Sequence, residues 1–134
     1  MSWIVLVAVL AAGVVSSFTD WYFMGVLFHD RYFRFPETWW PRKSDEPMPI
    51  IYSCALGFIT AAAVIALCAL AGVDGIAGGL KVGFIAWLAG PLVHVVTTHI
   101  WIRIDAKVSA AHALGYLARF LVAGIAAGIA LPML

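Results

Sequence analysis

Charged residues are scarce in this chain, and the motifs that hold metals or carry acid–base chemistry are missing from it. Only 11% of its 134 residues are charged, against about a quarter in a typical soluble domain. Eight Lys and Arg are balanced by seven Asp and Glu, and no basic tract points to nucleic acid. No CxxC, HxxxH or paired-carboxylate motif occurs. We therefore predict no catalytic residues, no metal site, no cofactor and no nucleic-acid partner.

The few cysteines and histidines are poorly spaced for a disulfide or a shared metal ion. Cys54 and Cys68 fall in one apolar run, where fourteen residues of helix separate them by ~21 Å, far beyond disulfide reach. We interpret them as small core residues. His94 and His99 are five positions apart, roughly 140° around a helix, so one face cannot present both. His94 alone is either a hydrogen-bonded core histidine or a single axial ligand.

Long apolar runs dominate what remains. Hydrophobic residues make up 64% of the chain, the mean hydropathy is +1.01, and four apolar segments lie at about 3–28, 50–72, 79–102 and 111–131. Each is near or above the ~20 residues that a helix needs to cross a bilayer. The sequence predicts an all-α integral membrane protein, an antiparallel four-transmembrane-helix bundle forming a single domain over 1–134. A cleaved signal peptide is the alternative for the first segment, although no Lys or Arg precedes it.

Basic residues are concentrated in two of the three loops. The loop at 29–49 and the loop after the third segment hold six of the eight Lys and Arg: Arg31, Arg34, Arg42, Lys43, Arg103 and Lys107, against Lys81 alone after the second segment. The positive-inside rule then makes these two loops cytoplasmic and puts both termini on the outer, periplasmic side. We predict a multi-pass protein of the bacterial inner membrane. The aromatic and basic loop 29–49 fits either a lipid-headgroup site or a plain aromatic belt.

Each predicted helix carries one stripe of small and weakly polar residues, typical of helix packing in lipid. On the third helix the stripe is Gly83, Trp87, Gly90, His94, Thr97 or Thr98, and Trp101. Small residues four apart also occur as Gly75-x3-Gly79-x3-Gly83 and Gly124-x3-Gly128. The latter spacing is compatible with a homo-oligomer, and a membrane partner protein is the other expected contact besides the bilayer.

Three ionisable residues fall within the predicted spans at a similar depth. At ~1.5 Å per residue, Asp20, His94 and Arg119 lie ~10–13 Å in from the cytoplasmic ends of their helices. Because a lone charge at such depth is costly, intramembrane charges usually pair inside the bundle. We predict an Asp20–Arg119 pair with His94 beside it. The side chains expected to complete the hydrogen bonding of this cluster are Ser16, Thr60, Thr97 and Tyr116.

This polar cluster has two interpretations. In the first it only fixes helix register. In the second it is a site, since intramembrane charges often mark substrate, ion or proton routes. Our working hypothesis is binding or transport of a small molecule, lipid or ion at the cluster. The alternative is a non-catalytic structural or accessory subunit of a larger membrane complex, and an intramembrane enzyme ranks third.

The segment AAGVVSSFTDWYFMGVLFHDRYF resembles the first helix of the small bacterial membrane proteins classed as domain of unknown function 1761. Trp21, Tyr22, Leu27 and Phe28 match that family's pattern. Phe23 or Met24 replaces its proline, and His29 with Asp30 replaces its Gly-Lys turn. The segments GLKVGFIAWLAGPLVHVVTTHIW and ALGYLARFLVAGIAAGIAL are similar in layout to its later helices. The resemblance implies a compact four-helix membrane domain and no particular activity.

Overall fold

The computed structural model describes residues 2–41 and 47–134, and every regular element in that part of the chain is helical. The long helices are α1 (Trp3–Asp20), α2 (Met48–Leu70), α3 (Ile76–Trp87), α4 (Val93–Trp101) and α5 (Ala106–Ala130). Four stretches are long and apolar enough to span a membrane: Trp3–Leu27, Ile51–Leu70, Ile76–Trp101 and Ala106–Met133. The prediction of an all-α protein with four membrane-spanning helices is therefore confirmed.

Five shorter elements extend or join these helices. Two are π-helical, η1 (Trp21–Leu27) after α1 and η4 (Leu88–Leu92) between α3 and α4. Three are 3₁₀ turns: η2 (His29–Arg34), η3 (Pro36–Thr38) and η5 (Leu131–Met133). Arg42 and Lys43, which the orientation argument used, lie outside the described residues.

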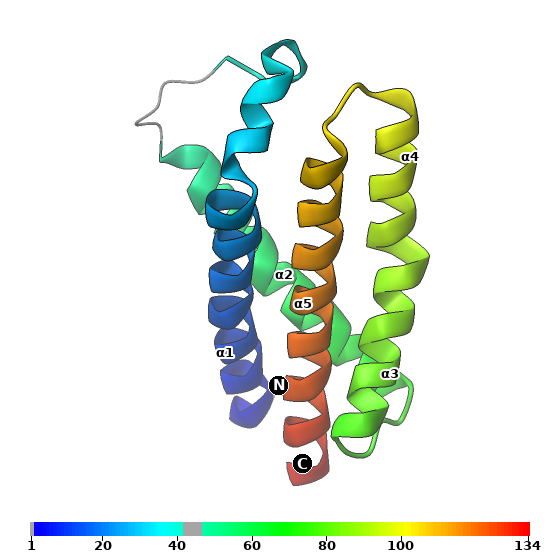
Figure 1. The fold of residues 1–134 in the computed structure, drawn as a ribbon. Helices are drawn as coiled ribbons and strands as arrows, with labels where there is room; N and C mark the ends of the chain where they lie inside the picture. Colours follow the sequence, from blue (N-terminus) through cyan, green and yellow to red (C-terminus); the bar gives the residue numbers. More distant parts are fainter. Residues whose placement is uncertain (1, 42–46) are drawn as a thin grey trace.

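Helix α5 is the centre of the bundle and packs against α1, α2 and α3. In Figure 1, α1, α5 and the α3–α4 pair stand side by side, and α2 crosses behind them at an angle. Both termini lie at one end of the bundle, with the segment that follows η1 and the turn between α4 and α5 at the other. Which side of the membrane each end faces stays a prediction.

The core of the bundle is built from small side chains. Its buried members are chiefly alanine, with Val64, Ile65 and Cys68. Cys68 is buried and Cys54 is half-buried, and neither forms a disulfide. Large apolar side chains instead point outward, as Leu70 does at 87% exposure. This arrangement suits a bilayer, where close backbone packing, rather than burial of large apolar side chains, holds helices together.

Glycines allow α3 and α5 to approach closely. The backbones of Gly79 and Gly124 touch where the helices cross, and a Cβ added to Gly83 would lie 2.5 Å from the carbonyl oxygen of Phe120. A Cβ added to Gly128 would lie 2.5 Å from the carbonyl oxygen of Gly75. The glycine spacings noted in the sequence therefore serve packing within the chain.

The π-helical segment η4 corrects the predicted stripe on the third span. Gly79 and Gly83 are buried as expected, but Gly90 and Thr97 are exposed. The cause is Pro91, which lacks the N–H needed for an α-helical bond. The wider turn contains one extra residue and rotates the following face by about 100°. Val95 is consequently the buried residue of α4.

Two helix starts also differ from prediction. Helix α5 begins at Ala106 rather than 111, because the carboxylate of Asp105 caps it by accepting a hydrogen bond from the Lys107 N–H at 2.8 Å. Helix α3 begins at Ile76 rather than 79, directly after Gly75, whose φ of +84° ends the preceding turn. Helices α3 and α5 both begin before their apolar runs begin. A prediction from hydropathy alone therefore places the start of each helix too late.

Candidate functional site

The predicted pair between Asp20 and Arg119 is present. Asp20 is the last residue of α1, Arg119 lies midway along α5, and an Arg119 guanidinium N–H donates to Asp20 Oδ2. The two side chains are 12% and 8% exposed, respectively. Gly115, one turn before Arg119, leaves space for the carboxylate, since a Cβ there would already contact Asp20 Oδ1 at 3.4 Å. The pair joins α1 to α5 within the apolar bundle.

Thr60 lies beside this pair, and Ser16 is buried one turn before Asp20 on α1, but neither completes the hydrogen bonding of the pair. Thr60 Oγ1 lies 3.5 Å from Arg119 Nη1, a long contact, and donates to the Leu56 carbonyl at 2.9 Å. Among the described residues, three buried polar atoms have no hydrogen-bond partner: Ser16 Oγ, Asp20 Oδ1 and Arg119 Nε. Buried polar atoms rarely stay unpaired. The ion pair is thus incompletely satisfied by the protein itself.

A row of polar side chains on α5 leads away from the pair. The Arg119 guanidinium lies 5.4 Å from the centre of the Tyr116 ring, and the Tyr116 and His112 rings are 6.0 Å apart. His112 Nε2 is in turn hydrogen-bonded to the Tyr32 hydroxyl at 2.9 Å. Residues four and three positions apart share one face of a helix. This face of α5 is therefore polar from Arg119 to the loop end.

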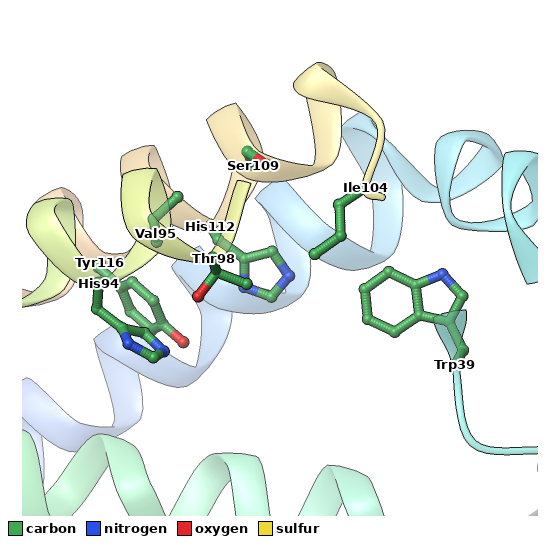
Figure 2. A pocket seen from close by; sticks show the side chains of 8 residues that line it. All are labelled: Trp39, His94, Val95, Thr98, Ile104, Ser109, His112 and Tyr116. Carbon is green, nitrogen blue, oxygen red and sulfur yellow. The ribbon is translucent and has the colours of Figure 1, made fainter. Parts of the chain in front are cut away.

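A pocket of about 190 Å³ lies beside this row, between α4 and α5. Eight residues line it: Trp39, His94, Val95, Thr98, Ile104, Ser109, His112 and Tyr116. Figure 2 shows His94 and Tyr116 near one end of the pocket, Thr98 and His112 in the middle, and Trp39 beyond Ile104 at the other end. We call this cavity the α4–α5 pocket.

The predicted cluster is therefore divided between two places. Asp20, Arg119 and Thr60 form the largely buried ion-pair centre, with Ser16 buried one turn earlier on α1, whereas His94 lies on the exposed side of α4 in the wall of the α4–α5 pocket. Tyr116 belongs to both, because it lines the pocket and faces the Arg119 guanidinium.

Thr97 belongs to neither place. It is exposed, and its neighbour Thr98 lines the pocket instead. The sequence allows either Thr97 or Thr98 on the stripe of the third helix, and Thr97 is the residue predicted for the polar cluster. The extra residue in η4 rotates the face of α4, and this rotation turns Thr98 instead of Thr97 towards the pocket. Sequence reasoning missed Ser109, Ile104 and the lining role of His112, although the polar spacing of Ser109, His112 and Tyr116 was a visible signal.

The segment 29–41, which we call the strap, is tied to the turn between α4 and α5. Arg34 Nη1 pairs with Asp105 Oδ2 at 2.7 Å, and Thr38 Oγ1 donates to the Arg103 carbonyl at 2.9 Å. The Arg103 guanidinium lies 4.5 Å from the centre of the Phe35 ring. These contacts hold the strap against the α4–α5 turn, and Trp39 of the strap forms part of the pocket wall.

Electrostatics at the loop end favour this arrangement. The hydrogen bond from Arg34, with that from the Lys107 N–H, holds the pKa of Asp105 below its usual value. Burial, and then the proximity of Tyr116, raises the pKa of Tyr32 to about 12. Asp105 is therefore ionised and Tyr32 neutral over a wide range around neutral pH. No group of three or more His, Cys, Asp or Glu within residues 2–41 and 47–134 could hold a metal ion.

Comparison with known proteins gives a family for the chain. The family model described as protein of unknown function, DUF1761, matches residues 7–128. The chain belongs to the DUF1761 family. That match covers both the ion-pair centre and the α4–α5 pocket, and it confirms the resemblance noted in the sequence. No curated protein and no solved structure matches the chain. The function of this DUF1761 member has to be argued from its own geometry.

Proposed function

We propose that this protein binds a small molecule taken from the membrane, and that the α4–α5 pocket is the site. The observation that carries this proposal is the polar row His112, Tyr116 and Arg119, which joins a cavity of about 190 Å³ to a buried, incompletely satisfied ion pair. Hydrogen-bonding groups converging on an otherwise apolar pocket are typical of ligand sites. Ionisable side chains inside a membrane-spanning bundle are costly and often mark functional sites.

We infer that the Asp20–Arg119 pair supports the pocket by fixing the position of α5 beside it. The pair is largely buried, and Tyr116, which lines the pocket, lies 5.4 Å from the Arg119 guanidinium. The pair holds α1 against α5 and keeps the Tyr116 ring at a set distance from the Arg119 guanidinium. The binding half of the working hypothesis is the one that this geometry supports.

The site's position fits a protein of the bacterial inner membrane with cytoplasmic loops. The strap and the α4–α5 turn lie together at one end of the bundle and contribute Arg31, Arg34 and Arg103 there, while the termini lie at the other end. Basic residues are enriched on the cytoplasmic side of membrane proteins. In this orientation the α4–α5 pocket lies near the cytoplasmic surface.

A pair of neighbouring leucine substitutions tests this proposal. Ser109 lines the pocket, whereas Ala110 beside it is exposed. Ser109→Leu fills the pocket and Ala110→Leu leaves it open. Adding an extract of the native membranes to delipidated protein should raise the Tm of the wild type and of Ala110→Leu, because a ligand that binds only the folded state stabilises it. Equal stabilisation of Ser109→Leu, or none in any variant, would overturn the assignment of the pocket.

One observation favours the second candidate, a structural or accessory subunit of a larger membrane complex. The outer face of η4 and α4 exposes Gly90, whose Cβ position is open, and Thr97. Small and weakly polar residues on a membrane-spanning face are typical of helix–helix contacts. Disulfide cross-linking from Thr97→Cys in native membranes tests this face. A cross-linked partner protein supports the second candidate, whereas a cross-link between two copies of this chain, or a monomer with unhindered labelling of that thiol, contradicts it.

A further inference from the structure

We propose that the ligand of the α4–α5 pocket is the headgroup of a membrane quinone, with its isoprenoid tail lying in the bilayer. This inference rests on the proposed function, because it names the molecule class for the same pocket. Four properties of the pocket carry it: the charge of its lining, its free hydrogen-bonding groups, its size and its access.

The lining is neutral. None of the eight lining residues is Lys, Arg, Asp or Glu. The two strap cations that the structure describes are each already paired, Arg34 with Asp105 and Arg31 with Asp30. Charged groups taken out of water need charged or hydrogen-bonding partners. The pocket therefore favours an uncharged ligand over a phosphate or carboxylate.

Hydrogen-bonding groups face the pocket from both helices. Two lining residues are already engaged, Ser109 with His99 at 3.0 Å and His112 with Tyr32 at 2.9 Å. In the part of the chain that the structure describes, His94, Thr98 and Tyr116 make no side-chain hydrogen bond. Each can donate one. Donors on two opposed helices fit a flat ring that carries a carbonyl acceptor on each of two opposite edges, which is the pattern of a quinone.

The size and the flat side chains also fit one ring. A cavity of about 190 Å³ has the volume of about six water molecules, which is below the usual range for drug-sized ligands. Trp39, His112 and Tyr116 give it aromatic walls, against which a planar ring can stack. This volume suits a single substituted ring better than a phospholipid headgroup with its glycerol.

The pocket can be entered from the bilayer. His94 is exposed and Thr98 half-buried on α4, which belongs to the candidate span Ile76–Trp101. The opposite end of the pocket is lined by Trp39 and Ile104 from the strap and the α4–α5 turn. A ring entering beside His94 leaves its tail among the lipids. A molecule with a polar ring and a long apolar tail matches both environments.

Two adjacent threonines provide the test. Thr98 lines the pocket and Thr97 does not, so Thr98→Val removes one pocket hydroxyl while Thr97→Val removes an equivalent hydroxyl outside it. The probe is ubiquinone-1, titrated into protein in lipid nanodiscs and measured by quenching of tryptophan fluorescence, with empty nanodiscs correcting for partition into lipid. Circular dichroism and thermal unfolding confirm that both variants fold.

We expect saturable binding to the wild type, unchanged binding to Thr97→Val, and about three- to tenfold weaker binding to Thr98→Val, the effect of losing one hydrogen bond. Absence of saturable binding, or equal weakening in both variants, overturns the quinone assignment. In that case stabilisation by the native membrane extract, retained in Ala110→Leu and lost in Ser109→Leu, still supports a pocket ligand of another class. If neither the saturable quinone binding nor the stabilisation by the native membrane extract is seen, the proposed function is overturned as well.

Discussion

Asp20 and Arg119 lie 99 positions apart in the sequence and form an ion pair inside the bundle. In the described part of the chain, neither charge takes part in another ion pair. Their contact links the first and last membrane-spanning helices.

Breaking this pair should cost far more stability than breaking an exposed one. Asp20→Ala leaves the Arg119 charge buried without a partner, which typically costs about 3–5 kcal/mol. Asp30→Ala is the matched control, because Asp30 pairs with Arg31 at 3.1 Å on the surface and should cost about 1 kcal/mol or less. Unfolding in detergent measures both. Equal costs would show that the buried pair contributes nothing special.

Exchanging the two charges separates the pair from its surroundings. The double variant Asp20→Arg with Arg119→Asp should recover part of the stability that either single substitution loses, because opposite charges again face each other. Double-mutant analysis of the same unfolding data gives the coupling. If both single variants and the exchange are tolerated alike, Asp20 and Arg119 are not coupled.

The close approach of α3 to α5 predicts different effects on stability for alanine substitutions at two glycines of the same span. Gly83→Ala places a Cβ 2.5 Å from the Phe120 carbonyl oxygen, whereas a Cβ on Gly90 meets nothing within 4 Å. We expect Gly83→Ala to destabilise the protein by about 1–3 kcal/mol through overpacking. Gly90→Ala should be neutral or slightly stabilising, because alanine is the better helix former. A lower Tm for Gly90→Ala than for Gly83→Ala would contradict the described α3–α5 contact.

A feature of this structure could be predicted from the sequence where its cause lies within one helix, and could not where its cause is a contact between distant segments. The Asp20–Arg119 pair was predictable, because helix rise gives depth and a buried charge requires a partner. The exchange of Thr97 for Thr98 was not, since a regular helical period continues the stripe through Pro91, and a proline alone does not tell whether the helix kinks, ends or takes in an extra residue. The role of Trp39 was also hidden, because the path of the strap depends on the contact between Arg34 and Asp105.

The strap should loosen in acid. Its partner Asp105 has a pKa held below the usual value by the Arg34 hydrogen bond. The stabilisation is therefore complete above the unfolded-state pKa and is lost as the pH falls through the lower, folded-state value. Asp105→Asn keeps a helix-capping side chain but carries no charge. Hydrogen exchange of strap amides, corrected for intrinsic rates, should rise in acid for the wild type and vary little for Asp105→Asn; an acid response of the same size in both would refute this role.

A second titration reports the contact between the strap and α5. The pKa of Tyr32 is raised to about 12 from an ordinary value of 10.0, so the neutral hydroxyl is favoured in the folded state. Its stabilisation is present below pH 10 and is lost as the pH rises towards 12. Ultraviolet titration should show a late-ionising tyrosine that Tyr32→Phe removes, with Tyr52→Phe, exposed on α2, as the control. An unchanged late step in Tyr32→Phe would place that ionisation elsewhere.

The account's central claim is that the α4–α5 pocket holds a membrane-derived molecule, and native mass spectrometry of protein released gently from its own membranes tests it most directly. The wild type and Ala110→Leu should carry a bound molecule of one defined mass, and Ser109→Leu, whose side chain fills the pocket, should have lost it. The same molecule bound equally to all three proteins, or to none, would contradict the claim.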